Sequence, residues 1–328
     1  MKKYIAIAVV CLTITGIRAS LAGNGPAGKA ALGKLLFFDP ILSKDRTISC
    51  ASCHIPAFGF ADTSIVSLGV RKQKGVRNTP AVMNTARQPF FFWDGRAKTL
   101  EEQALMPIEN PVEMNLPVAT AVKRLAQSKT YSAWFAKVFN GAPTPGRLAE
   151  AIAAFEQTLE TSESAFDRWK FNDDSNAVSD AVKRGFVLFS KKGKCTQCHF
   201  GADFTQNQFR NIGLFNGREL NDSGRMVISG NPEDIGKFKT PGLRNIAITA
   251  PYMHNGMFNS LEEVIEFYND PGKRVPNAIN RDTVLLRPLG LTAVEKKDLE
   301  AFLLSLTDKQ FLPVKKTSSD AHRRSSTR

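Results

Sequence analysis

Histidine is scarce in this chain of 328 residues: there are four, and none lies between His54 and His199. Cysteine is nearly as rare, with five residues. Beyond an N-terminal run, no apolar stretch is long enough for a membrane helix, and no alternation of apolar residues is strong enough to predict a large sheet. We therefore expect a soluble, mainly α protein in which the few histidines and cysteines carry the chemistry.

Four of the five cysteines occur in two Cys-x-x-Cys-His motifs. These are Cys50-Ala-Ser-Cys53-His54 and Cys195-Thr-Gln-Cys198-His199. In such a motif the two thiols bond to the vinyl groups of a haem, and the histidine ligates its iron. A four-sulfur zinc site or a thioredoxin-like redox pair would leave the histidine after each second cysteine unexplained. The sequence therefore predicts two covalently bound haem c groups.

Both ends of the chain differ from its body. Lys2 and Lys3 precede an apolar run that ends near a Ser-Leu-Ala cleavage site, so residues 1–22 are expected to be a signal peptide for export to the periplasm. Residues 313–328 are rich in Lys, Arg, Ser and Thr, which predicts a disordered basic tail. Much of the net charge of +13 lies in these segments, and haem propionates would offset most of the rest, so we expect no nucleic-acid partner.

The length of the remaining chain suits two domains. The stretches Gly33-Lys-Leu-Leu-Phe37 and Gly185-Phe-Val-Leu-Phe189 each precede a haem motif and indicate a duplicated unit. We predict two cytochrome c-like domains, residues 23–174 and 175–312, each around one covalently bound haem c. Periodicity and capping patterns predict helices in segments 26–38, 119–125, 131–139, 147–169, 184–192, 260–268 and 292–306, and a long turn-rich connection over 56–117.

The second axial ligand decides what each haem can do, because an iron with an open position can bind a small molecule. At the first haem the position is open unless it is reached by Met83, Met106, Met114 or His254. At the second haem the candidates are Met226, Met253, Met257, His254 and Tyr268. Tyr268 lies on the apolar stripe of its predicted helix, where a tyrosine is more often a packed core residue than a ligand. Residue spacing alone leaves this choice open.

Several further segments, taken together with the two haem motifs, form a pattern that is specific to one group of proteins. They are Cys50 to Phe60 with Asp62, Gly75-Val-Arg-Asn78-Thr-Pro80, Trp93-Asp-Gly-Arg96, Thr240-Pro-Gly-Leu-Arg-Asn245 and Thr249-Ala-Pro-Tyr-Met-His-Asn-Gly256. In these segments the chain resembles the bacterial di-haem cytochrome c peroxidase family, including its MauG-like branch, from about Gly33 to Leu306. The resemblance implies that the haem at His54 reacts with peroxide.

The resemblance also assigns roles to individual residues. Gln103, Pro107 and Glu113 would form the peroxide pocket, in which Glu113 moves a proton between the two peroxide oxygens and Gln103 orients the substrate. Trp93 would relay electrons between the haems. Tyr268 matches the place of the sixth ligand of the second haem. A calcium ion would be held by Asn78 and by the backbone carbonyls of Thr249 and Pro251.

Two positions depart from the typical peroxidase pattern. Val70 stands where typical members carry a histidine that blocks the first haem, so we expect no need for reductive activation. Tyr268 stands where typical members carry methionine, as in MauG-like proteins. A phenolate favours ferric or higher iron states, whereas a thioether favours ferrous iron.

The expected function is reduction of hydrogen peroxide with electrons from a small c-type cytochrome or a cupredoxin, by an enzyme that is not stably inserted in a membrane. A homodimer is one state left open. One alternative is a MauG-like enzyme that uses peroxide to oxidise a protein or organic substrate. An alternative of another class is a non-catalytic di-haem electron carrier, which requires a second strong ligand at the first haem.

Overall fold

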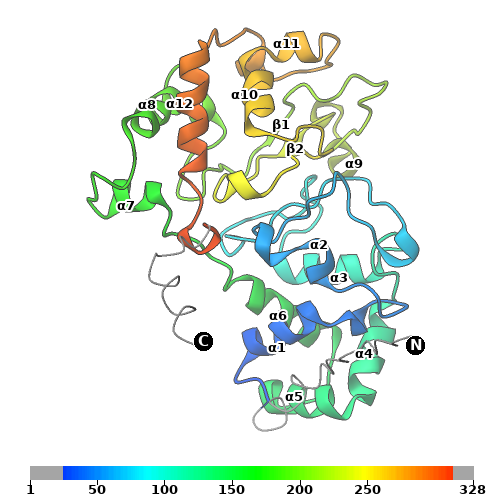
Figure 1. Ribbon diagram of the computed structural model, residues 1–328. Coiled ribbons are helices and arrows are strands. Elements are labelled where there is room, and N and C mark those ends of the chain that lie inside the picture. The colour runs from blue at the N-terminus through cyan, green and yellow to red at the C-terminus, as the bar shows by residue number, and fades with distance from the viewer. Residues whose placement is uncertain (1–24, 313–328) are drawn as a thin grey trace, which may run out of the picture.

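A computed structural model describes residues 25–312, whose helices form two lobes, one above the other in Figure 1. We call α1 to α6 the N-terminal lobe and α7 to α12, with one short sheet, the C-terminal lobe. The helices are α1 (Lys29–Phe38), α2 (Cys50–Cys53), α3 (Leu100–Glu109), α4 (Val118–Gln127), α5 (Lys129–Phe139), α6 (Pro145–Glu156), α7 (Ala165–Phe171), α8 (Asp180–Ser190), α9 (Met226–Ser229), α10 (Leu261–Asn269), α11 (Pro271–Arg274) and α12 (Ala293–Leu304). The prediction of a mainly α fold is confirmed.

The sheet is minimal. Strands β1 (Phe209–Arg210) and β2 (Phe238–Lys239) pair antiparallel, with Phe209 opposite Lys239. Within residues 25–312 no helix combines the length and the apolar character needed to cross a membrane. The expected signal peptide and basic tail, residues 1–22 and 313–328, lie outside the described residues.

Side-chain caps determine where the predicted helices begin. Ser260 and Thr292 open α10 and α12, and each forms a capping box with the glutamate three residues on. Both predicted starts are confirmed. The helices predicted over 26–38, 119–125 and 131–139 are found as α1, α4 and α5, and the one predicted over 184–192 is found as α8, which begins four residues earlier.

Two predictions about local structure were wrong. Segment 147–169 is not one helix, because α6 ends at Glu156 and α7 begins at Ala165, after Ser164 and Asp167 form a capping box. Segment 56–117 is not wholly a turn-rich connection, because it contains the ten-residue helix α3, which Thr99 caps through the N–H of Glu102. The Thr-x-x-Glu pattern at Thr99 was the available signal for that start.

Each lobe is built on one close helix crossing. In the N-terminal lobe α1 packs on α6, and a Cβ atom on Gly33 would lie 1.7 Å from the carbonyl oxygen of Ala151. In the C-terminal lobe α8 packs on α12, and a Cβ atom on Gly185 would lie 2.0 Å from the carbonyl oxygen of Asp298. Both positions therefore require glycine, which explains why the two leader segments resemble each other.

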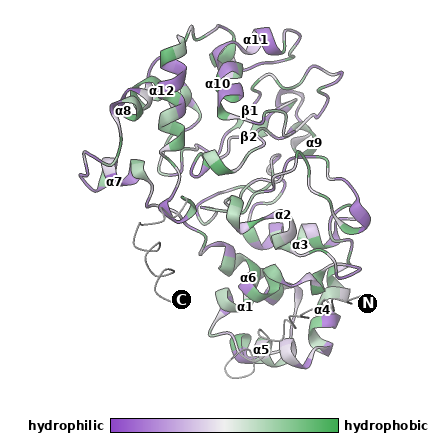
Figure 2. Cartoon of the chain, viewed as in Figure 1, coloured by the Kyte–Doolittle hydropathy of each residue, from purple (hydrophilic) through white to green (hydrophobic). Residues whose placement is uncertain are grey.

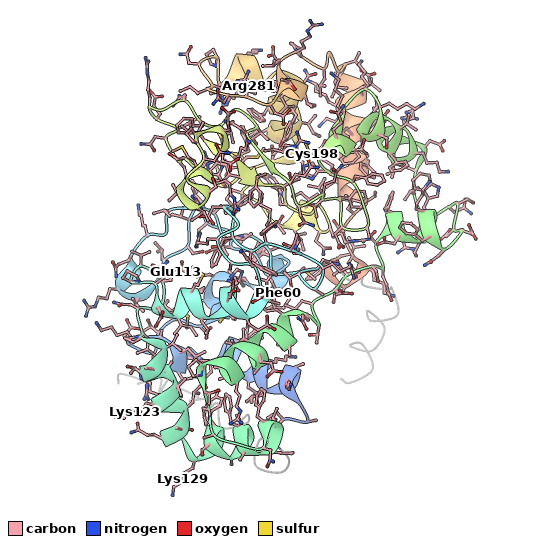
Figure 3. All side chains as sticks on the ribbon, turned by 180° about the vertical axis from the view of Figure 1, so that it is seen from behind. Phe60, Glu113, Lys123, Lys129, Cys198 and Arg281 are labelled. Atoms are coloured by element: carbon pink, nitrogen blue, oxygen red, sulfur yellow. The ribbon has the colours of Figure 1, made fainter. Side chains whose placement is uncertain are left out.

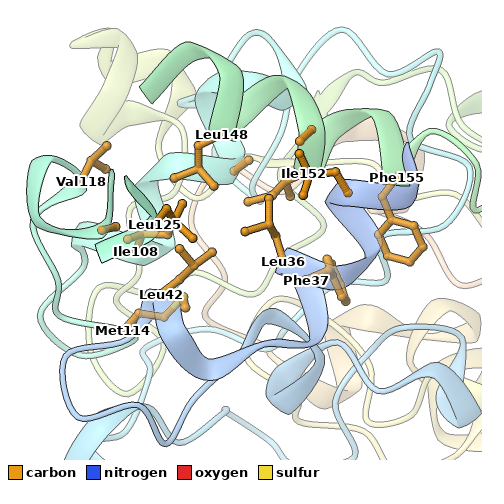
Figure 4. Close-up of a cluster of buried hydrophobic side chains, with 14 of the residues drawn as sticks. Leu36, Phe37, Leu42, Ile108, Met114, Val118, Leu125, Leu148, Ile152 and Phe155 are labelled. Carbon is orange, nitrogen blue, oxygen red and sulfur yellow. The ribbon is translucent and has the colours of Figure 1, made fainter. Parts of the chain in front are cut away.

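Apolar side chains fill the space around these crossings. Figure 4 shows the cluster of the N-terminal lobe, where Leu36 and Phe37 of α1 meet Ile152 and Phe155 of α6. The phenylalanine rings Phe37 and Phe155 lie 5.1 Å apart. In the C-terminal lobe the corresponding rings, Phe189 and Phe302, lie 4.9 Å apart. Hydrophobic residues gather on the helices of both lobes, as Figure 2 shows, while much of the connecting chain is polar.

Helix α7 packs with the apolar cluster of the C-terminal lobe. Phe166 lies among Phe186, Phe204 and Phe302, with ring centres 5.3 to 5.6 Å away. Asp167 forms an ion pair with Arg244 at 2.9 Å. This packing favours a boundary between the lobes before α7 rather than at residue 174, and the division into two domains stays a prediction.

The glycine at the α1–α6 crossing can be tested by thermal unfolding of the haem-loaded protein. Replacing Gly33 by Ala pushes a methyl group into the backbone of Ala151, so we expect the free energy of unfolding to fall by about 2 kcal/mol. The matched control is Gly146→Ala in α6, where a Cβ atom would meet nothing within 4 Å. Equal stability of the two variants would contradict the role of the crossing.

Candidate functional site

The residues predicted to carry function lie around one cavity of about 460 Å³, which residues of both lobes line. The predicted site residues that line it are Cys50, Cys53, His54, Asn78, Trp93, Gln103, Pro107, Glu113, Cys195, Cys198, His199, Thr249, Pro251 and Tyr268. Figure 3 shows Glu113 and Phe60 in the N-terminal lobe and Cys198 in the C-terminal lobe. The structure thus brings together every predicted site residue, although their roles stay predictions.

The first motif forms the single turn α2. Ser49 precedes it and forms a capping box with Ser52, which fixes the turn that carries Cys50 and Cys53. The Nδ1 atom of His54 lies 3.1 Å from the carbonyl oxygen of Phe60. Burial lowers the pKa of His54, so the ring is neutral, with Nδ1–H donating to that carbonyl. Nε2 is therefore the nitrogen left for a metal.

The second motif repeats this arrangement in the C-terminal lobe. The Nδ1 atom of His199 lies 2.9 Å from the carbonyl oxygen of Phe204, and burial again lowers the pKa of the imidazole. Burial raises the pKa of the Cys195 thiol to about 12, so the thiol stays protonated and its sulfur faces an apolar environment. Two cysteines and one neutral, oriented histidine at each end of the cavity fit a haem c at each motif.

Glu113 stands at the first motif, just after α3. Its Oε1 atom accepts a hydrogen bond of 2.6 Å from the side-chain amide of Asn110. Burial raises the pKa of Glu113, while the Asn110 bond and the nearby charge of Arg96 act in the opposite direction. The carboxyl is thus held in one orientation and can exchange a proton more easily at neutral pH than an exposed glutamate.

Helix α3 supplies the other two predicted pocket residues. Pro107 lies inside the helix and has no N–H to donate to the carbonyl of Gln103, four residues earlier. The side-chain oxygen of Gln103 is buried and has no hydrogen-bond partner among the described residues. A buried amide oxygen without a partner is unusual and is expected where a ligand or water supplies the missing donor.

The loop around Val70 packs directly on the Glu113 segment. The N–H of Val70 donates to the carbonyl oxygen of Glu113 at 2.8 Å, and Val70 is buried with 1% exposure. A Cβ atom on Gly69 would lie 2.2 Å from the carbonyl oxygen of Val112, so the two segments touch through their backbones. Val70 itself is absent from the cavity lining, and no group at this position can ligate a metal.

Trp93 lies between the two lobes. Its indole N–H donates to the carbonyl oxygen of Asn78 at 2.8 Å, and its own carbonyl accepts from the N–H of Lys239 at 2.7 Å. The ring meets the imidazole of His254 edge to face, with centres 6.4 Å apart. Contacts from both halves of the sequence therefore fix its orientation.

An ion network beside Trp93 joins the lobes. Arg77 binds Asp222 through two nitrogens, at 2.7 and 2.8 Å, and also pairs with Asp94. Arg96 pairs with the same Asp94 at 2.9 Å, and Arg225 donates to the carbonyl oxygens of residues 94 and 95. A bidentate, half-buried pair is stronger than an exposed one. The network holds the Trp93 segment against the C-terminal lobe.

The candidates for the second axial ligands separate by position. Of the methionines and the histidine considered, Met83, Met114, Met253 and His254 line the cavity, whereas Met106, Met226 and Met257 do not. His254 stacks on Phe238 with ring centres 3.6 Å apart. Tyr268 of α10 lines the cavity of the second motif and has its pKa raised by burial.

The chain is similar in sequence to known proteins of one family. A family profile described as di-haem cytochrome c peroxidase matches residues 27–176. The chain is 39% identical over 280 residues to the methylamine utilization protein MauG of Methylorubrum extorquens, covering 85% of this chain and 78% of that protein. The chain belongs to the di-haem cytochrome c peroxidase family. It is also 39% identical to a cytochrome c551 peroxidase of Nitrosomonas europaea, over 81% of this chain and 84% of the relative.

Solved structures agree with this family. A MauG-like protein associated with microbial copper homeostasis is 32% identical, with a TM-score of 0.79 over 87% of this chain and 91% of that one. The di-haem peroxidase BthA of Burkholderia thailandensis is 28% identical, with a TM-score of 0.77 over 89% of each chain. The chain is therefore a peroxidase-type oxidoreductase, and its family implies two haem c groups and a peroxide substrate.

Sequence reasoning missed several residues that line or brace the cavity. The ion network around Arg77 and Asp222 joins positions 145 apart in sequence, so no local pattern predicts it. Lys239 lines the cavity, and its ammonium group donates to the side chain of Gln88 at 2.8 Å. Glu156 is buried at the end of α6, and a signal existed, because it follows Ile152 by four residues on an apolar helix face.

Removing the Asn110 amide should change how Glu113 titrates. In Asn110→Ala, burial remains while the hydrogen bond that lowers the pKa is lost, so we expect the pKa of Glu113 to rise further. The acid limb of the pH profile for the reaction of ferric enzyme with peroxide should then move to higher pH. Gln73→Ala is the control, since Gln73 donates to the nearby carbonyl of Pro111 and not to Glu113. A limb that stays in place would show that Glu113 does not set it.

Proposed function

We propose that the protein reduces hydrogen peroxide to water with electrons from a small redox protein, either a c-type cytochrome or a cupredoxin. One observation carries the proposal: both Cys-x-x-Cys-His motifs line a single cavity, with Glu113 and Gln103 beside the first and Trp93 between the lobes. Covalent attachment of one haem c at each motif is part of the proposal, with His54 and His199 as the proximal ligands.

The chain's own residues can handle the protons of this reaction. Haem at the first motif, when bound, supplies the iron that binds peroxide. The carboxylate of Glu113 takes a proton from one peroxide oxygen and returns it to the departing oxygen, which leaves as water. Its bond to Asn110 keeps the carboxyl oriented, and the unpartnered side chain of Gln103 orients the substrate without titrating. Pro107 shapes the helix that presents Gln103.

The second site is proposed to deliver electrons. His199 and Tyr268 would be the axial ligands of the second haem, and Trp93 would relay electrons to the first. Tyr268 supports this role because it lines the same cavity as the second motif. Val70 offers no ligand to the first iron, so the enzyme should react with peroxide without prior reduction.

A second candidate function follows from Tyr268. A phenolate ligand favours oxidised iron, which makes the second haem a poorer electron acceptor and a better store of oxidising equivalents. That property suits a MauG-like enzyme that uses peroxide to oxidise a protein or organic substrate.

The remaining expectations are also proposals. Asn78 and the carbonyls of Thr249 and Pro251 line the same cavity, which supports a calcium ion there, although the Asn78 amide donates to the carbonyls of Ser64 and Ile65 in this structure. Export to the periplasm through residues 1–22 and a homodimeric state are proposed as well. So is a division into two domains, with the boundary before α7.

The ligands of both irons can be tested by electron paramagnetic resonance of the ferric protein. We expect a high-spin signal from the first haem and a low-spin signal from the second. Tyr268→Phe removes the phenolate and should abolish the low-spin signal while leaving the high-spin one. Two low-spin signals that persist in Tyr268→Phe would favour a non-catalytic electron carrier instead.

The proton role of Glu113 predicts a specific loss of rate. Glu113→Gln keeps the size and the bond to residue 110 but cannot take up a proton, so we expect the reaction with peroxide to slow by about 10²- to 10⁴-fold. Stopped-flow absorbance of the haem measures this rate. Cyanide binding to the same variant should still occur, and a variant that retains the full peroxide rate would exclude the role.

A further inference from the structure

Glu156 is a buried glutamate that lines the cavity, and no step above uses it. It is the last residue of α6 and is 3% exposed. Within residues 25–312 it forms no ion pair, and its Oε2 atom has no hydrogen-bond partner. Glutamate is seldom buried without a partner, because removing its charge from water is costly. The burial of the Glu156 carboxyl therefore needs an explanation other than packing.

Glu156 lines the same cavity as the first haem motif. Burial raises the pKa of the Cys50 thiol, and the charges of Glu156 and Glu113 raise it further, so Cys50 lies within electrostatic range of both carboxyls. Helix α6 packs against α1, which leads into the motif, and against α3, which carries Gln103. Glu156 therefore lies on the helix that contacts both the helix leading into the first motif and the helix carrying Gln103.

The C-terminal lobe shows what this position needs for packing alone. Gly33 meets Ala151 and Phe155, and Gly185 meets Asp298 and Phe302, so the residues after the phenylalanines correspond. The residue that corresponds to Glu156 is Leu303, which is 7% exposed and also lines the cavity. An apolar side chain thus satisfies the fold at this position. The carboxyl of Glu156 is an addition specific to the first site.

We propose that Glu156 is a redox-linked proton-binding residue of the first haem, taking up one proton when the iron is reduced and releasing it when the iron is oxidised. This inference rests on the proposed haem at Cys50–His54. The exchange balances: reduction adds one electron from the redox partner and one proton from solvent to the carboxylate, and oxidation returns both. Glu156 acts on the iron through its charge. It is therefore not a catalytic residue.

The electrostatics of the site favour such a coupling. Burial raises the pKa of Glu156 to about 8, so the carboxyl can change its charge near physiological pH. A carboxylate stabilises the more positive ferric state, and by reciprocity reduction of the iron strengthens proton binding. The titratable and charged groups on the segments around α6 and in the cavity beside it are Cys50, Cys53, His54, Arg96, Glu113, Lys29, Lys34, Glu101, Glu102, Glu109, Lys123 and Arg124. Among the described residues none of them forms a hydrogen bond or an ion pair with Glu156.

Potentiometric titration of the first haem from about pH 6 to about pH 10 tests the proposal. In the wild type we expect the midpoint potential to fall as the pH rises through the pKa of Glu156. If reduction of the iron strengthens proton binding tenfold, the potentials at the acidic and the alkaline plateau differ by about 59 mV. Glu156→Gln and Glu156→Leu should remove this pH dependence and keep the potential near the acidic plateau. Glu150→Gln, on the exposed face of the same helix, should titrate like the wild type.

The same potential-against-pH slope in Glu156→Gln and the wild type would overturn the proposal, as would a slope that only Glu113→Gln abolishes. If neither Glu156 variant folds, the reduced-minus-oxidised infrared spectrum of the wild type decides: a protonated-carboxyl band must appear on reduction and shift in heavy water, and its absence overturns the proposal. Haem content, measured separately by pyridine haemochrome absorbance, shows whether the proposed haem at Cys50–His54 is present, so failure of that function is distinguishable.

Discussion

The backbone contact between two crossing helices is the constraint on which each half of this molecule depends. Gly33 brings α1 against α6, and Gly185 brings α8 against α12, at distances that admit no side chain. The contact brings one phenylalanine of each helix against one of its partner helix, and a further phenylalanine carbonyl orients the histidine of each motif. Packing of the helices thus sets the surroundings in which each motif histidine is held.

A network of charged side chains joins the two halves. Arg77 and Asp222 span the boundary, and Asp94 brings Arg96 into the same network. Trp93 is adjacent to Asp94 in sequence, so the network that joins the lobes also fixes the aromatic ring between them. Because these groups are only partly exposed, salt should screen them less than it screens surface pairs.

The parts of the structure that could be predicted from the sequence are those determined by adjacent residues. The spacing within the two Cys-x-x-Cys-His motifs predicts the two haem groups that the family implies. The starts of α10 and α12 follow from Ser260 and Thr292, whose caps are local. The end of α6 at Glu156 has no local signal, because no glycine or proline follows it, whereas the start of α7 does have one in the Ser164-x-x-Asp167 capping box. The network at Arg77 depends on segments that meet only in the folded protein, since Arg77 and Asp222 lie 145 positions apart.

The shared cavity has a consequence for how the two lobes are held together. Its lining comes from both lobes, so a group bound in it contacts side chains that lie far apart in the sequence. A ligand that binds only the folded arrangement stabilises that arrangement. The proposed haems would therefore strengthen the association of the lobes as well as carry the chemistry.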